Sequence, residues 1–160
     1  MYENLTCCFT GHRHILKSDY PSIKTATTRE IIRLINNGVK FFGVGGAIGF
    51  DTMVASIIIK LRELYPHIKL ILVLPCKNQD QYWCEKSKET YNTIKTAADK
   101  IVYISETYTK NCMANRNKHL VNNSKYCICY LKQNYGGTAF TVNYAKRKGL
   151  YIYNVAKNDK

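Results

Sequence analysis

The chain has 160 residues, and 46% of them are hydrophobic, which is enough for the core of one domain spanning residues 1–160. No apolar run is long enough to cross a membrane, and no charged start leads into one, so we expect neither a transmembrane span nor a secretory signal. The formal net charge is +13. This charge indicates either an anionic partner, such as a nucleotide, a nucleic acid or an acidic protein, or a lysine-rich surface that serves only solubility.

The seven cysteines are odd in number and lack zinc-finger spacing. Cys7, Cys8, Cys127 and Cys129 lie in apolar runs, where cysteine behaves as a small core residue. The histidines show no ligand spacing with the cysteines, so no metal site is expected. A reduced, cytoplasmic protein without membrane contact is the simplest interpretation.

Apolar runs alternate with amphipathic segments along the whole chain. We expect strands at about 5–9, 40–44, 68–74, 101–104, 126–131 and 150–155. The helices are expected at about 21–37, 47–64, 82–98, 112–122 and 138–148. Strict alternation with apolar strands predicts an α/β fold: a doubly wound, mainly parallel sheet of about six strands with helices on both faces. In such sheets ligands bind at the carboxyl ends of the strands.

Two glycine-rich turns are expected at that rim. The first contains Gly45, Gly46 and Gly49, which lack a Cβ, so the backbone can turn sharply and present N–H groups and a helix N-terminus to a phosphate. The second is Gly136-Gly137-Thr138, which opens the last helix. The alternatives are tight packing of a helix onto the sheet for the first turn and an N-cap formed by Thr138 for the second.

Two arginines, one aspartate and one histidine are further candidates for the site. Arg13 and Arg116 are candidates for charge-assisted phosphate binding, a task for which arginine is better suited than lysine. Asp51 either hydrogen-bonds ribose hydroxyls or stabilises a helix dipole. His12, which follows Gly11, either contacts a ligand or acts as acid or base near neutral pH, or is a structural hydrogen bonder.

Five motifs in register resemble the SLOG superfamily, specifically its YpsA-like branch, which is related to DprA and to the lonely-guy phosphoribohydrolases. They lie at 9–13, 45–51, 74–83, 115–117 and 136–138, so the resemblance covers nearly the whole chain. It implies a Rossmann-like fold, a homodimer, and a nucleotide-derived ligand at the rim.

The resemblance also bears on catalysis. Arg116 resembles the arginine of the phosphoribohydrolases, but the position of their glutamate is occupied by Thr141, which cannot act as a carboxylate. Arg116 and Asp51 are the remaining catalytic candidates. Whether the chain is an enzyme therefore stays open.

The leading hypothesis is a sensor or sequestering module that needs no cofactor and binds an ADP-ribose, NAD-like or cyclic-nucleotide ligand. One alternative is an N-glycosidic hydrolase of nucleoside monophosphates. Another is DprA-like binding of single-stranded nucleic acid, suggested by the charge and the interleaved tyrosines. Tyr126 and Tyr130, however, lie in predicted strands and fit the core better. The role of Cys76, at the rim, is left open.

Overall fold

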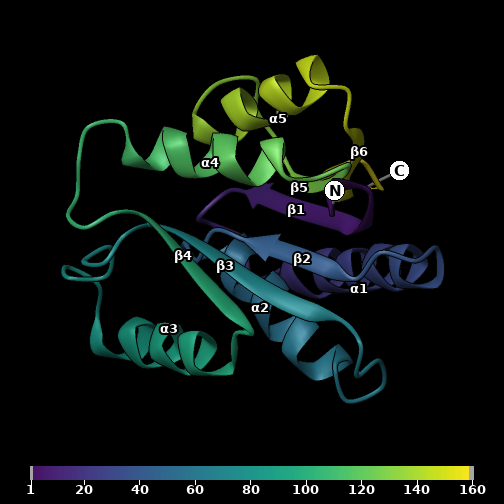
Figure 1. Ribbon diagram of the computed structural model, residues 1–160, viewed down its shortest axis with the longest axis horizontal. Helices are drawn as coiled ribbons and strands as arrows, with labels where there is room; N and C mark the ends of the chain where they lie inside the picture. The colour runs from purple at the N-terminus through teal and green to yellow at the C-terminus, as the bar shows by residue number, and fades with distance from the viewer. Residues whose placement is uncertain (1, 159–160) are drawn as a thin grey trace.

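The computed structural model describes residues 2–158 and shows a Rossmann-like, doubly wound α/β fold (Figure 1). All strand pairs are parallel, and the order across the sheet is β4-β3-β2-β1-β5-β6. The strands are β1 (Thr6–Gly11), β2 (Phe41–Val44), β3 (Lys69–Cys76), β4 (Lys100–Ser105), β5 (Tyr126–Tyr130) and β6 (Tyr151–Asn154). The helices are α1 (Tyr20–Asn36), α2 (Phe50–Leu61), α3 (Glu85–Ala97), α4 (Cys112–Asn122) and α5 (Gly137–Arg147), with 3₁₀ turns η1 (Glu3–Leu5) and η2 (Val155–Asn158). The predicted fold class is confirmed.

Two helical layers cover the sheet. α4 and α5 pack against each other at the top of Figure 1, whereas α1, α2 and α3 belong to the other layer. The larger core lies on the side of α1 to α3 and includes Phe9, Phe42 and Phe50. The smaller core lies under α4 and α5 and contains Cys8, Cys127 and Cys129. These cysteines are therefore small core residues, as the apolar runs indicated.

The residues of the edge strands are more exposed to solvent than those of the central strand β1. The middle four residues of β1 are buried, and β1 pairs with β2 on one side and β5 on the other. In β4 and β6 no residue is fully buried. An edge strand has a neighbour on one side only, so its aromatic side chains, such as Tyr103 and Tyr151, reach solvent.

Two helices begin later than their apolar periodicity predicts. α2 begins at Phe50 rather than at residue 47, because Gly49, the residue before it, has φ of 86°, outside the helical region. It ends at Leu61, and Leu64 is exposed. α3 begins at Glu85 rather than at residue 82, since Cys84 before it is extended. Among residues 2–158, no helix is both long and apolar enough to cross a bilayer.

Gly49 fixes the path of the chain at the rim. The N–H of Phe50 donates to the carbonyl of His12 at 3.2 Å, which joins the start of α2 to the turn after β1. A Cβ on Gly49 would overlap the backbone of Arg13. The glycine therefore serves a close approach between two backbone segments as well as a positive φ.

Substitution of Gly49 by alanine tests this packing. We expect Gly49→Ala to lower the free energy of unfolding by about 2–4 kcal/mol, because a strained φ and a backbone overlap add together. Gly149→Ala is the matched control: Gly149 has φ 79°, but its Cβ would meet nothing within 4 Å. That control should lose only about 1 kcal/mol. Urea unfolding measures both, and equal losses would contradict the close approach.

Candidate functional site

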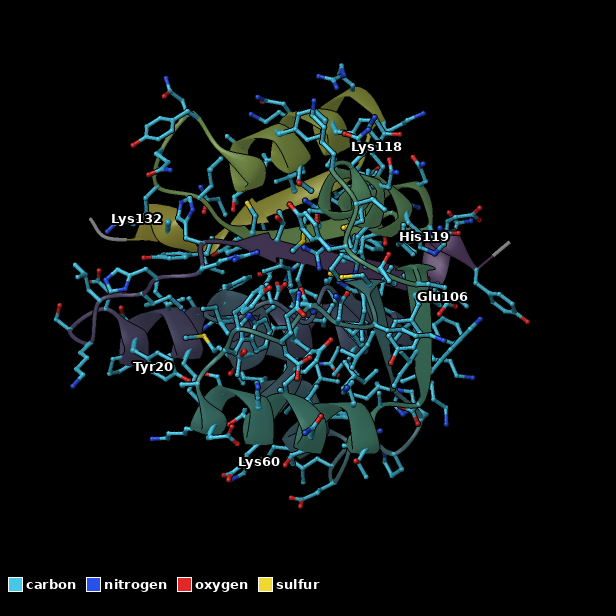
Figure 2. All side chains as sticks on the ribbon, turned by 90° about the vertical axis from the view of Figure 1, so that its left-hand side faces the viewer. Tyr20, Lys60, Glu106, Lys118, His119 and Lys132 are labelled. Atoms are coloured by element: carbon cyan, nitrogen blue, oxygen red, sulfur yellow. The ribbon has the colours of Figure 1, made fainter. Side chains whose placement is uncertain are left out.

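The rim of the sheet contains a pocket at the point where the strand order reverses. The chain builds β1 to β4 outward in one direction and then returns to place β5 beside β1. Figure 2 looks toward the strand ends at which this reversal opens. A pocket of about 270 Å³ lies there. Its lining residues are Phe9, Thr10, Gly11, His12, Arg13, Ala47, Asp51, Met113, Arg116, Asn117, Gly137 and Thr138.

Larger hollows elsewhere lack the charge arrangement of this pocket. A hollow of about 560 Å³ beside η1 and β4 contains no buried charged side chain. Another of about 380 Å³ beside β6 contains buried Glu30, but Glu30 is paired with Arg33. The rim pocket instead contains a buried cation and a buried carboxyl group, so we place the candidate site there.

Arg116 is the buried cation, and only 5% of its surface is exposed. Its Nε donates to Oδ1 of Asn117 at 2.7 Å, and one terminal nitrogen contacts Sδ of Met113 at 3.7 Å. The other terminal nitrogen donates to the carbonyl of Gly45. A Cβ on Gly45 would lie 2.6 Å from that nitrogen, so the absence of a side chain there allows the contact.

Asp51 is the main opposite charge that acts on Arg116. Burial lowers its pKa below the usual value, Asp51 opposes this shift, and the like charge of Arg13 adds to it. A guanidinium nevertheless stays protonated in proteins. No ion pair within 4.0 Å involves Arg116 in the part of the chain that the structure describes. A buried cation without an ion-pair partner is stabilised by any anion that enters the pocket.

Asp51 supplies the buried carboxyl group. Its Oδ2 accepts the N–H of Ala47 at 3.2 Å, whereas its Oδ1 is buried without a hydrogen-bond partner. Burial raises the pKa of Asp51, and the charges of Arg116 and Arg13 and the Ala47 N–H partly counter the shift. The structural role at the start of α2 thus accounts for one oxygen, and the second is buried without a partner.

His12 links the first strand to the loop after the fifth. Its Nε2 accepts the backbone N–H of Lys132 at 2.9 Å, and its ring packs edge-on against Tyr130. Burial, followed by the charge of Lys132, lowers the pKa of His12. A neutral ring that accepts through Nε2 carries its proton on Nδ1. His12 therefore holds the loop at Lys132 through Nε2 and keeps one N–H donor at Nδ1.

The N-terminus of α5 forms another wall of the pocket. Gly136 is the N-cap, with φ 93°, and no side chain caps the helix. The N-cap alternative for Thr138 is therefore not what the structure shows. The first N–H groups of a helix have no intrahelical partner and favour an anion, and Gly137 and Thr138 line the pocket.

Most predicted site residues meet in this pocket, but four glycines do not line it. The seven that do are Gly11, His12, Arg13, Asp51, Arg116, Gly137 and Thr138. The four that do not are Gly45, Gly46, Gly49 and Gly136. Gly46 packs against Leu74 and Gly49 against Arg13, so these glycines shape the turn. Their contact with phosphate stays a prediction.

The sequence interpretation missed five lining residues: Phe9, Thr10, Ala47, Met113 and Asn117. A usable signal existed for two of them. Met113 precedes Arg116 by about one helical turn and Asn117 follows it directly, and both hold the guanidinium. A buried arginine needs partners, and its own helix is the nearest source.

Thr141 and Cys76 lie outside the lining of the pocket. Thr141 is buried and donates to the carbonyl of Gly137 at 2.9 Å. It thus has a hydrogen-bonding role within α5. Cys76 is buried beside Cys112, and burial raises the pKa of its thiol, which lowers its reactivity. Cys76 is a packed residue.

Comparison with known proteins assigns the family. The model of the YspA SLOG family matches residues 7–156. The chain belongs to this family. It is 29% identical over 129 residues to a UPF0398 protein of Brevibacillus brevis, covering 79% of this chain and 69% of the relative. It is 28% identical over 121 residues to the SPbeta prophage-derived protein YoqJ of Bacillus subtilis, covering 68% and 71%.

Two solved structures share the fold of this SLOG protein. DNA processing protein A (DprA) from Streptococcus pneumoniae superposes with a TM-score of 0.67 at 17% identity, over 96% of this chain and 50% of that one. DprA from Helicobacter pylori, whose structure is described for its single-stranded DNA binding mode, gives 0.66 at 18% identity, over 94% and 64%. The SLOG chain thus spans half to about two thirds of these proteins.

The raised pKa of Asp51 predicts that this carboxyl group lowers the free energy of unfolding by an amount that depends on pH. A folded pKa above the unfolded one means that stability falls as pH rises from the unfolded pKa through the folded pKa. We therefore expect Asp51→Asn to gain stability relative to the parent as pH rises from about 4 to 7. Thermal unfolding across this range, without ligand, measures the difference. A difference that does not change with pH would contradict the assignment.

Proposed function

We propose that this SLOG protein binds a nucleotide-derived anion, of the ADP-ribose, NAD-like or cyclic-nucleotide kind, as a sensor or sequestering module. The single observation that carries the proposal is the buried guanidinium of Arg116, which lines the rim pocket and has no ion-pair partner within 4.0 Å among residues 2–158. Membership of the SLOG family and the shared fold with DprA support a nucleotide-related ligand in general.

The lining of the pocket suggests which part of the ligand each group contacts. A phosphate placed between Arg116 and the N-terminus of α5 would receive charge-assisted bonds from one side and backbone N–H groups from the other. The unpartnered Oδ1 of Asp51 would accept a bond from a ribose hydroxyl. A volume of about 270 Å³ is small for a whole dinucleotide. The base and any second phosphate would then extend outward past exposed Arg13.

The decisive variant is Arg116→Met, which removes the charge at similar side-chain volume. The variant leaves the carbonyl of Gly45 without its donor, so thermal unfolding is measured beside binding to show that it folds. Loss of one charge-assisted phosphate contact costs about 1.5–3 kcal/mol, which is at least a tenfold loss of affinity. The control is Arg29→Gln, which removes an exposed arginine of α1 and should bind normally.

Calorimetric titration with ADP-ribose, NAD, AMP and cyclic AMP measures these affinities, and adenosine serves as the phosphate-free control. We expect at least one phosphate-bearing compound to bind the parent and adenosine to bind far more weakly. A parent that binds none of them, or Arg116→Met binding as well as Arg29→Gln, would contradict the proposal. Denaturing extraction and mass spectrometry of purified protein would identify a co-purified ligand, and native mass spectrometry would test the predicted homodimer.

A hydrolytic use of the same pocket has one observation in its favour. Burial raises the pKa of Asp51, which keeps a carboxyl group protonated to higher pH next to Arg116. Such a group can act as a general acid on a leaving base. The test is release of free base from nucleoside monophosphates by the parent and by Asp51→Asn. Release of base by the parent, abolished in Asp51→Asn, would establish catalysis. No release at high protein concentration would mean that the pocket binds its ligand without hydrolysing it.

A further inference from the structure

A second cationic cluster lies on the outside of α4 and α5, away from the lining of the rim pocket. Three cations surround the ring of Tyr144: Lys148 Nζ at 5.5 Å, the Arg147 guanidinium carbon at 5.7 Å and Lys118 Nζ at 5.8 Å from its centroid. The hydroxyl of Tyr144 donates to Oδ1 of Asn122 at 2.8 Å, which ties the ring to α4. The cluster therefore has a defined shape that joins the two helices.

Among residues 2–158, no carboxylate forms an ion pair with these three cations. The sequence contains no Asp or Glu between Thr107 and Asn158, a span that includes both helices. The ion pairs found among residues 2–158 include none of Lys118, Arg147 and Lys148. Figure 2 shows Lys118 beside α5, on the opposite side of the molecule from Lys60 of α2. Like charges gathered around one ring repel each other, and a polyanion relieves this repulsion.

An exposed aromatic ring accompanies the cations. Phe140 is one helical turn before Tyr144 and is 43% exposed, and its ring centroid is 5.9 Å from Lys118 Nζ. A flat apolar ring beside cations suits a partner that alternates phosphates with unstacked bases. A membrane surface would require several exposed apolar side chains, whereas the neighbouring exposed residues Asn122 and Asn143 are polar.

We propose that this surface, made of Lys118, Phe140, Tyr144, Arg147 and Lys148, binds single-stranded nucleic acid. The three cations pair with successive phosphates, and Phe140 stacks on a base. The site is separate from the rim pocket, since none of these five residues lines that pocket. Binding here and binding of a mononucleotide in the pocket can therefore succeed or fail independently.

The test compares two triple variants that remove equal charge. Lys118→Gln/Arg147→Gln/Lys148→Gln neutralises the proposed surface. Lys24→Gln/Lys60→Gln/Lys86→Gln removes three exposed lysines from α1, α2 and α3, in the other helical layer. Fluorescence anisotropy with an oligothymidylate of about 16 nucleotides, at several salt concentrations between about 50 and 200 mM, gives affinity and salt slope.

We expect the surface variant to lose at least tenfold in affinity, and its slope of log K against log salt to become shallower by about two, because three phosphate contacts are removed. The control should keep the parent's slope. Phe140→Leu should lose about tenfold in affinity without changing the slope, and Phe140→Trp should restore binding, since only the stacking ring differs.

Several results would overturn the proposal. These include failure of the parent to bind the strand at the lowest salt and an equal loss of affinity in the two triple variants. Equal binding of polyglutamate, unaffected by Phe140→Leu, would indicate an acidic protein partner instead, and a preference for anionic vesicles would indicate a membrane surface. Titration of the surface variant with the mononucleotides that the parent binds keeps the two sites distinguishable, because its pocket affinity should be unchanged.

Discussion

The guanidinium of Arg116 joins the two helical layers at the rim of the sheet. It belongs to α4 on one side and donates to the carbonyl of Gly45, in the turn that leads to α2 on the other. Asp51, in the first turn of α2, lines the same pocket, and its Oδ1 is buried without a hydrogen-bond partner. One buried positive charge thus contacts both the turn that leads to α2 and the helix α4.

This arrangement explains why the glycine-rich turn has the sequence it has. Gly45 leaves space for the guanidinium, Gly46 and Gly49 adopt positive φ, and Gly49 lies against the turn after β1. Each glycine therefore meets a steric demand of the protein itself. Under the proposed function, the turn would contribute the carboxyl group of Asp51 and the positive charge that Gly45 helps to hold.

The fold could be predicted from the sequence because strands and helices are indicated by local patterns of apolar residues. Apolar runs and their spacing predict strands and helices, and the central strand β1 is buried as its composition indicates. The start of α2 was wrong by one turn because apolar periodicity continues through residues whose φ excludes a helix. The meeting of Arg13 and Asp51 followed from a general rule about parallel sheets. Arg116, inside a helix, was singled out instead by the acid-free third of the chain and by the family resemblance. The unpartnered oxygen of Asp51 depends on side-chain packing that no local pattern encodes.

The most direct test of the central claim is a crystal structure with the tightest-binding compound of the nucleotide panel. The account predicts a phosphate between the Arg116 guanidinium and the first N–H groups of α5, with a ligand hydroxyl within hydrogen-bond distance of Asp51 Oδ1. A ligand bound elsewhere, with no anion at Arg116, would contradict it.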